Sequence, residues 1–382
     1  MNSTGRGGGD RPQAMHLRGI VLPEGVRRDL FVVDGRITFH EQEDATTILE
    51  GGYLAPGLVD AHAHLSLASP ASRHAPPDVR VRASAKTQLE AGVLALREPG
   101  SPDYASLDVG PGEGLPRMYT GGRFLAPPGG YFPGLGREVT DEELPEAAEQ
   151  EARASGSWAK VIGEWPTRNG RMQANFRPET LVEAARRVHA LGARIAIHAN
   201  IPDSIEAAIE AGFDSIEHGW NLQDDHIEAM RARGITFVPT IIITPSAPHW
   251  IPGMGLTPAW QRTLLDAARR HGEVVLRAVQ AGVQVLAGTD AGMGPHGMVG
   301  TEIQLMLDAG VPPDMALGAA SWLARRFLGL PGLEEGGLAD IVAYPDDPRG
   351  DTAVLARPSL MVLDGRVILS PDMKHDQQGH LH

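Results

Sequence analysis

The sequence contains no cysteine, and this absence excludes a whole group of stabilising and metal-binding arrangements. A chain without cysteine forms no disulfide and offers no thiolate to a metal ion. Any transition metal that it binds tightly must therefore be held by histidine, aspartate, glutamate or a modified side chain. The absence alone leaves the redox compartment open.

Long apolar runs and a basic charge balance are missing as well. No stretch reaches the roughly 18 apolar residues that a membrane-spanning helix requires. Lysine and arginine number 34 against 48 aspartates and glutamates, which gives a formal net charge of −14. This balance argues against nucleic acid or an anionic membrane as the main partner.

Both ends of the chain lack the features of a targeting or metal-binding segment. The N-terminal MNSTGRGGGDRPQ is polar and glycine-rich and has no apolar core, so it is not a secretory signal. We predict a disordered leader over residues 1–14 and a cytoplasmic protein. Residues 371–382 contain three histidines but are polar and unpatterned, which predicts a disordered tail.

What the sequence does contain is typical of a folded globular chain, with 42% hydrophobic and 21% charged residues. VVDGRITF (32–39) and VLDGRVIL (362–369) share a strand–Asp-Gly–strand pattern, and the Asp-Gly pair is a strong hairpin signal. Since similar β segments occur at both ends, we predict that they pair. The result would be a small discontinuous β-sandwich domain made of residues 15–56 and 331–370.

The middle of the chain, residues 57–330, alternates short apolar strands with amphipathic helices. This alternation is typical of a parallel sheet, and the eight strand–helix units are enough to close it. We therefore predict an α/β fold, a (β/α)8 TIM barrel, beside the β-sandwich. The Gly/Pro-rich stretch 121–138 is too long for a simple connector and is predicted to be an active-site loop.

Polar residues interrupt the apolar runs at the carboxyl ends of several predicted strands. His62 and His64 end the first strand, and because strand side chains alternate between faces, both point to the same side. His198, His218 and Asp290 each end a later strand in the same way. Barrel active sites lie at this end, so the five residues are predicted to converge on a divalent metal ion such as Zn²⁺.

Lys160, in WAKVIGEW, is harder to assign from the residues alone. It lies near the start of the predicted fourth strand, where a surface lysine or an ion pair explains it equally well.

Several motifs are more specific than these patterns, among them GGYLAPGLVDAHAHL, GVLALREPG, SWAKVI, IAIHAN, AGFDSIEHG, VLAGTDAG and GLEEGGLADIVAYPDDP. With them the chain resembles the amidohydrolase superfamily over residues 15 to 370. It is most similar to the subgroup that contains imidazolonepropionase-like enzymes and Xaa-Pro or Xaa-Arg dipeptidases. The resemblance implies a metal-bearing barrel with a β-sandwich built from both termini, and it leaves a homo-oligomer open.

Carried over by residue, the resemblance implies two metal ions. His62, His64 and Asp290 would bind the more buried ion, and His198 and His218 the more exposed one. Lys160 would be carboxylated by CO₂ to a carbamate that bridges the two ions. A metal-bridging hydroxide would be the nucleophile, with Asp290 taking its proton, in the cleavage of an amide or cyclic amide C–N bond.

The sequence departs from this subgroup at positions that concern substrate. Tyr131 stands where the dipeptidases usually carry a histidine, and Asn200 and Ile201 follow His198 where a tyrosine is usual. We predict Tyr131, His249 and His296 as substrate residues. Arg97 is either a carboxylate-binding residue or a structural ion-pair partner, and we favour the second.

Two other readings stay open. In a mononuclear deaminase or imidazolonepropionase-type hydrolase Lys160 would have no metal role, but such enzymes commonly need an acidic residue soon after the fifth-strand histidine. The nearest one here is Asp203, beyond Pro202. A non-catalytic barrel scaffold is disfavoured because all six ligand positions are filled.

Overall fold

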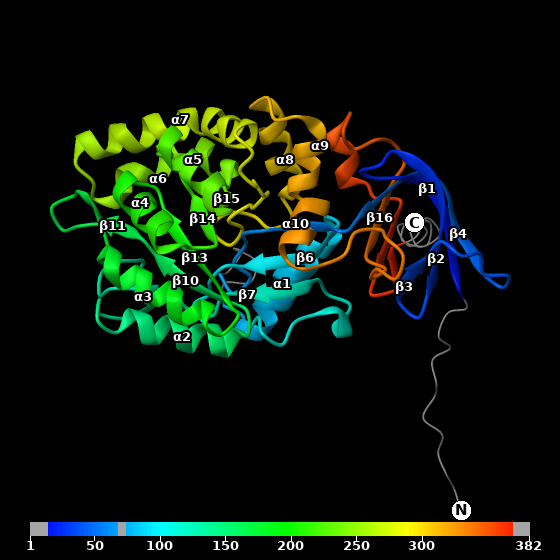
Figure 1. Cartoon of the computed structure of the whole chain (residues 1–382), viewed down its shortest axis with the longest axis horizontal. Helices are drawn as coiled ribbons and strands as arrows, with labels where there is room; N and C mark the ends of the chain where they lie inside the picture. The colour runs from blue at the N-terminus through cyan, green and yellow to red at the C-terminus, as the bar shows by residue number, and fades with distance from the viewer. Residues whose placement is uncertain (1–13, 68–73, 370–382) are drawn as a thin grey trace, which may run out of the picture.

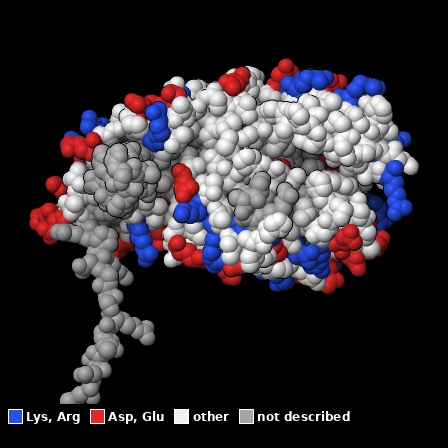
Figure 2. Space-filling view, turned by 180° about the vertical axis from the view of Figure 1, so that it is seen from behind, with Lys and Arg blue, Asp and Glu red and all other residues white. Residues whose placement is uncertain are grey.

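The computed structural model describes residues 14–67 and 74–369 (Figure 1). The predicted tail and all but the last residue of the predicted leader lie outside these ranges. Within them, no helix combines the length and the apolar character needed to cross a membrane. On the face seen in Figure 2, lysine and arginine are mixed with acidic side chains along the rim and form no continuous basic patch.

Strands from both ends of the chain share one seven-stranded sheet, in the order β18-β17-β16-β4-β1-β2-β3. From the N-terminal end come β1 (Met15–Val21), β2 (Val26–Val33), β3 (Arg36–Thr38) and β4 (Thr46–Pro56). From the C-terminal end come β16 (Ile341–Tyr344), β17 (Leu360–Leu363) and β18 (Arg366–Leu369). The sheet is hydrogen-bonded without a break, because β4 pairs with both β1 and β16.

The two Asp-Gly pairs form the hairpin turns that the sequence predicts. Asp34 and Gly35 have φ of 49° and 78°, and Asp364 and Gly365 have φ of 53° and 72°. Positive φ at both central residues is the requirement of a type I′ turn, which matches the twist of the flanking strands. These turns join β2 to β3 and β17 to β18.

The remaining parallel strands form two further sheets. One contains β5 (Leu58–Asp60), β6 (Val93–Glu98) and β7 (Arg117–Thr120). The other contains β8 (Phe124–Ala126), β10 (Trp158–Ile162), β13 (Arg194–Ala199), β14 (Ser215–His218) and β15 (Thr236–Val238), with β9 (Gly136–Glu138) at its edge. Parallel bridges from Ser101 to Arg123, Phe237 to Val285 and Ala63 to Ala291 connect the two sheets into a ring. The predicted mixed α/β fold is confirmed.

Helices lie around this ring, and several of them connect one strand to the next along the chain (Figure 1). They include α1 (Pro77–Glu90), α2 (Leu144–Ser155), α3 (Pro178–His189), α4 (Pro202–Ala211), α5 (Asp224–Arg233), α7 (Pro258–Gln280) and α8 (Val299–Asp308). The short α9 (Pro313–Ala319) and α10 (Trp322–Phe327) follow. In α3 the buried residues Leu181, Ala184, Ala185 and Val188 recur at helical spacing, so one face packs on the ring.

The stretch 121–138 is not one loop, as the sequence predicted, because it contains β8 and β9. β7 and β8 are two parts of one strand path that bends at Gly121 and Gly122. A side chain at Gly121 would lie 2.2 Å from the carbonyl oxygen of Pro99, and Gly122 has φ of +63°. Gly121 and Gly122, which suggested a loop, therefore mark a bend. Only residues 127–135, between β8 and β9, remain a loop.

Candidate active site

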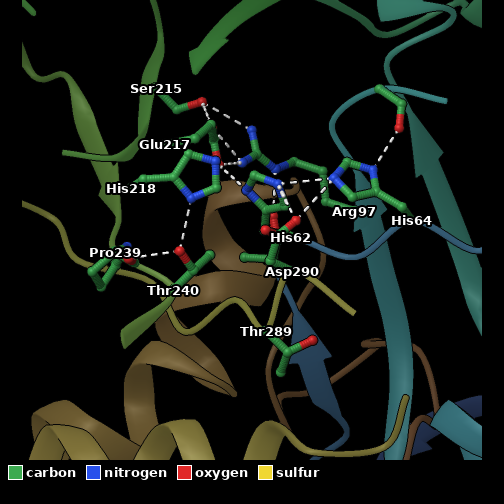
Figure 3. A network of polar contacts seen from close by, with 12 residues as sticks. His62, His64, Arg97, Ser215, Glu217, His218, Pro239, Thr240, Thr289 and Asp290 are labelled. Carbon is green, nitrogen blue, oxygen red and sulfur yellow. Dashed lines mark hydrogen bonds and ion pairs between the residues drawn. The ribbon is translucent and has the colours of Figure 1, made fainter. Parts of the chain in front are cut away.

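Three of the predicted residues form a compact group. His62 and His64 follow the carboxyl end of β5. Asp290 follows a segment that is bridged to β15 at Val285 and is not itself a strand, contrary to the prediction. Figure 3 shows the side chains of His62, His64 and Asp290 turned toward one another. The two Nε2 atoms lie 3.1 Å apart, and Oδ1 of Asp290 lies 3.4 Å from Nε2 of His62 and 3.2 Å from Nε2 of His64. All three residues are buried.

These separations fit a shared metal ion. Ligand atoms placed about 2.0–2.1 Å from a tetrahedral ion lie about 3.3–3.4 Å from one another. The observed 3.1 to 3.4 Å between the three atoms match that spacing. Two imidazole nitrogens and a carboxylate oxygen are also donors that Zn²⁺ and related divalent ions accept.

His62 and His64 are each held by a protein partner on the ring nitrogen that faces away from this group. Nδ1 of His62 lies 2.7 Å from Oε2 of Glu217, and Nδ1 of His64 lies 2.7 Å from the carbonyl oxygen of Gly100. An acceptor at Nδ1 places the ring proton there and leaves a lone pair on Nε2. Both imidazoles are therefore oriented as metal ligands are.

His218 and His198 lie beside the first group. The ring centroid of His218 is 5.0 Å from that of His62 and 4.6 Å from that of His198. Nδ1 of His218 lies 2.8 Å from Oγ1 of Thr240, while Nε2 of His198 lies 3.2 Å from Nδ2 of Asn200 and 3.5 Å from Oε1 of Glu164. Each ring again has one nitrogen occupied and one left for the centre.

Burial keeps these imidazoles neutral. It lowers the pKa of His62 to about 4, against the opposing effect of Glu217. Burial, reinforced by Lys160, lowers the pKa of His198 to about 3, and burial together with His198 holds the pKa of His218 well below its usual value. Only the neutral imidazole has the lone pair that binds a metal ion, so these rings are ready at neutral pH.

Lys160 is in the interior, 1% exposed, and its Nζ has no hydrogen-bond partner. Burial lowers the pKa of this amine to about 8, although Glu217 opposes the shift. The surface-lysine alternative is therefore wrong. A buried amine without a hydrogen-bond partner destabilises the protein unless it binds or reacts with another group. Lys160 is such an unpartnered amine within the site.

Strained backbone brings two of the polar side chains into the site. The φ angles of His218 and Asp290 are positive, at 69° and 52°, and that of the nearby Thr240 is also positive, at 49°. Positive φ is uncommon outside glycine and costs on the order of 1–3 kcal/mol for each residue, so it tends to occur at functional sites. At His218 it interrupts the alternation of β14, so that Glu217 and His218 both contact this group of side chains.

Glu217, which no sequence pattern indicated, lies between Arg97 and His62 and contacts both. Both side chains are fully buried, and Nη2 of Arg97 lies 2.7 Å from each carboxylate oxygen of Glu217. Burial raises the pKa of Glu217, but Arg97, Lys160 and His62 outweigh it and hold the pKa well below its usual value. Arg97 is thus the structural ion-pair partner that we favoured.

Asp60 was also missed, although it adjoins the HxH pattern. Its carboxylate accepts hydrogen bonds from Oγ1 of Thr289 at 2.5 Å, the backbone N–H of Thr289 at 3.0 Å and Nε2 of Gln88 at 3.0 Å. These bonds fasten the turn that carries Asp290 to the end of β5. Asp60 could have been recognised from its place in the sequence, two positions before the first histidine of the HxH pair.

The three predicted substrate residues have different surroundings. The ring of Tyr131 packs 5.3 Å from Phe124 and 5.0 Å from Trp165, and burial together with Asp290 raises the pKa of its hydroxyl. His296 is 8% exposed, and neither ring nitrogen has a hydrogen-bond partner. The ring of Phe124 in turn packs 5.1 Å from that of His64, and burial, together with His64, lowers the pKa of His296 to about 4. His249 is exposed on α6 (Ala247–Trp250).

Gly292 lies in the turn after Asp290, where the backbone passes close to His64. It has φ of +103°, and a Cβ there would lie 2.4 Å from the carbonyl oxygen of His64. We expect Gly292→Ala to lower the unfolding temperature and weaken metal binding, with a stability loss of at least about 1 kcal/mol. Gly294→Ala is the matched control, because its Cβ would meet nothing within 4 Å. Equal melting and metal affinity in the two variants would contradict the role of Gly292.

The chain is similar to known proteins both in sequence and in fold. The chain matches the Amidohydrolase family over residues 53–368. An uncharacterized protein of Mycobacterium tuberculosis is 39% identical over 362 residues, spanning 93% of this chain and 96% of that protein. Ochratoxinase of Aspergillus niger is 32% identical over 196 residues, which is 48% of this chain and 39% of that enzyme. A solved structure of a Xaa-Pro dipeptidase with bound methionine has a TM-score of 0.80 at 21% identity, covering 94% of this chain and 100% of that one.

With these matches, the fold and the histidine–aspartate group define an enzyme, a hydrolase that acts on carbon–nitrogen bonds. The chain belongs to the amidohydrolase family. This confirms the family resemblance that the motifs predicted.

Proposed function

We propose that this enzyme hydrolyses an amide or cyclic amide bond of a small molecule with two divalent metal ions, for which Zn²⁺ is the best match. In this proposal the ring of parallel strands is a (β/α)8 barrel, and six side chains at its mouth hold the ions: His62, His64, Lys160, His198, His218 and Asp290. One observation carries the proposal. Three imidazoles, those of His62, His64 and His218, have a hydrogen-bond acceptor at Nδ1, which leaves the lone pair of Nε2 for an ion.

Carboxylation of Lys160 is part of the proposal, and its surroundings support it. Only an uncharged amine attacks CO₂, and a pKa lowered to about 8 by burial raises the uncharged fraction. The product, a carbamate, is anionic and has two oxygen donors. It would replace a buried amine that has no partner by a group that offsets the charge of two cations.

When bound, the two ions supply an activated water nucleophile and polarise the scissile carbonyl. Asp290 takes the proton released by the nucleophile and delivers it to the leaving nitrogen. Burial raises the pKa of Asp290, but His64, His62 and Lys160 outweigh it and keep the pKa below its usual value, so the carboxylate is ready to accept. Glu217 and Gly100 hold the first two imidazoles in place.

Substrate binding is assigned to Tyr131, His249 and His296 within the same proposal. Tyr131 is supported by its contact with Phe124, whose ring in turn packs on His64, and His296 by two buried ring nitrogens without a partner. His249 lies on the exposed α6, beside the exposed Trp250, and would contact the outer part of a substrate. The cytoplasm remains the proposed location of the enzyme.

A mononuclear deaminase or imidazolonepropionase-type hydrolase is the second candidate. The observation that favours it is the compactness of His62, His64 and Asp290, whose ligand atoms lie within 4.8 Å of one another. Within the described residues no other histidine or carboxylate belongs to a group that tight.

Metal content distinguishes the two candidates. We expect about two ions per chain by elemental analysis when the protein is prepared with bicarbonate and Zn²⁺, and about one in Lys160→Met. The second ion should be lost because the bridging carbamate is lost. Lys86→Met is the matched control, since this lysine side chain is 71% exposed on α1. One ion per chain in the unmodified protein would reject the binuclear centre and leave the mononuclear alternative.

A further inference from the structure

Four aromatic side chains, Phe124, Tyr131, Trp165 and Phe132, form a row of rings that leads away from His64. The ring centroid of Phe124 is 5.1 Å from that of His64, and the ring of Tyr131 is 5.3 Å from that of Phe124. Trp165 and Phe132 follow, 5.0 Å and 5.2 Å from Tyr131 and 4.7 Å from each other. All of these contacts are tilted or edge-to-face, so within the row no ring has its face covered by a parallel ring.

The inner end of the aromatic row belongs to the candidate active site. Phe124 and Lys160 are register partners on the parallel strands β8 and β10, so their side chains point to the same face of the sheet. Both lie over Gly100, where a Cβ would be 2.6 Å from Cδ1 of Phe124 and 2.9 Å from Cγ of Lys160. The first ring of the row therefore lies beside His64 and Lys160, two of the six proposed ligands.

The outer end of the row lies on two segments that follow the carboxyl ends of strands. Tyr131 and Phe132 belong to the loop 127–135 after β8, and Trp165 comes shortly after β10. Phe124 is 1% exposed, Tyr131 and Trp165 are half-buried, and Phe132 is 38% exposed. Exposure thus rises along the row, which leads from the buried site to solvent.

The two segments that carry the outer rings are fastened together. β11 (Glu164–Pro166) and β12 (Met172–Ala174) form a hairpin, and Asn175 follows it directly. Nδ2 of Asn175 donates to the carbonyl oxygens of Gly130 at 3.0 Å and of Ile162 at 2.9 Å. The loop, the hairpin and the end of β10 are therefore held in place before a ligand arrives, which lowers the entropy lost on binding.

The composition of the loop indicates what kind of group the row would accept. The loop PPGGYFPGL (127–135) has no charged side chain, and the Tyr131 hydroxyl is its one polar side-chain group. A charged substituent placed there would lose hydration and gain no counter-charge from this loop. An aromatic ring would instead meet other rings edge-to-face or offset, the arrangements that aromatic pairs prefer.

We propose that the aromatic row is a substrate subsite, and that the amide cleaved at the centre carries an uncharged aromatic ring that packs against Tyr131, Phe132 and Trp165. The inference rests on the proposed function, since it names the class of substrate for the same site. Phe132 and Trp165 determine the specificity because they remain accessible to a ligand, whereas the buried Phe124 supports the inner end of the row.

Two pairs of neutral amides, each differing in one phenyl ring, test the subsite. N-acetylphenylalaninamide is compared with N-acetylalaninamide, which places the ring on the amine side, and N-benzoylglycinamide with N-acetylglycinamide, which places it on the acyl side. Saturation-transfer NMR measures their binding to the full-length protein, and assays after preparation with bicarbonate and Zn²⁺ measure their hydrolysis. We expect the ring-bearing member of at least one pair to bind tighter by about 10-fold or more, as burial of a phenyl ring typically contributes.

Phe132→Leu and Trp165→Leu each keep an apolar side chain but remove one ring. Each should reduce the preference for the ring-bearing amide about 2–10-fold, the typical contribution of one aromatic pair. Phe39→Leu is the matched control, because Phe39 follows β3 on the seven-stranded sheet and is 37% exposed, and it should leave the preference unchanged. Melting temperatures check the folding of the variants, and Phe132→Leu, at an exposed position, decides the test if Trp165→Leu unfolds.

Equal binding within both pairs, or a preference that survives in the folded variants, would overturn the proposal. A change of oligomeric state in Phe132→Leu with the preference intact would also overturn it, because the rings would then form a contact between copies of the chain. A failure of the proposed function looks different. If the ring-bearing amides bind tighter but the metal-loaded protein hydrolyses none of the four, the aromatic subsite stands and amide cleavage at the centre is rejected.

Discussion

Asp290→Asn is expected to abolish turnover and leave the protein folded. The carboxylate is the only group in the proposed centre that is placed both to share an ion with His62 and His64 and to carry the proton to the leaving nitrogen. General acid–base catalysis contributes about 10²–10⁴-fold to rates, so we expect kcat to fall by at least about 10³-fold. The loss should appear in kcat rather than in the affinity for substrate.

The fold should survive because asparagine suits the backbone at this position. Asp290 has φ of 52°, and asparagine is among the residues that adopt positive φ most readily. The backbone hydrogen bond from Asp290 to the carbonyl oxygen of His62, at 2.7 Å, is unchanged by the substitution. Kinetics of the metal-loaded variant and its melting temperature check both halves of this expectation. Asp308→Asn, at an exposed position of α8, is the control, and retained turnover in Asp290→Asn would reject the assigned role.

The sequence was sufficient for residues whose position follows from local periodicity. His62 and His64 were expected on one face because strand residues two apart share a face, and their Nε2 atoms indeed lie 3.1 Å apart. The Asp-Gly turns were equally local. The alternation of strands and helices predicted the mixed α/β fold, because each element has its own apolar period.

Residues that depend on long-range register or on local strain were not predictable in this way. Glu217 precedes His218 on β14, so strict alternation places the two side chains on opposite faces. The positive φ of His218 breaks that rule, and the sequence does not announce it, because positive φ is uncommon for any residue other than glycine. Glu164 reaches His198 only through the pairing of β10 with β13, which joins positions 36 residues apart.

Glu217→Gln is the substitution for which we expect the largest loss of stability. Arg97 and Glu217 are both 0% exposed, so the guanidinium has no water to replace its partner. Removing one charge of a buried pair costs about 3–5 kcal/mol, because the other charge is left uncompensated. His62 would also lose the carboxylate that holds its Nδ1, so metal affinity should fall together with the denaturation midpoint.

Denaturant unfolding of the metal-free protein separates the ion-pair effect from the metal effect. Glu113→Gln is the control, since Glu113 also contacts an arginine, Arg82, but both side chains are largely exposed and their charges are hydrated. We expect no measurable change there. If the two variants unfold at the same midpoint, the buried pair is not what stabilises this part of the ring.

A double variant shows whether the cost of Glu217→Gln is that of a stranded charge. Arg97→Met removes the guanidinium and also its bonds to the carbonyl oxygen of Ala61 and to Oγ of Ser215, so by itself it should destabilise the protein. Combined with Glu217→Gln, however, it leaves neither charge of the Arg97–Glu217 pair without its partner. The loss in the double variant should therefore be smaller than the sum of the two single losses, by at least about 1 kcal/mol for groups in direct contact. Strict additivity would mean that the energy of the site resides in the separate hydrogen bonds and not in the pairing of the two charges.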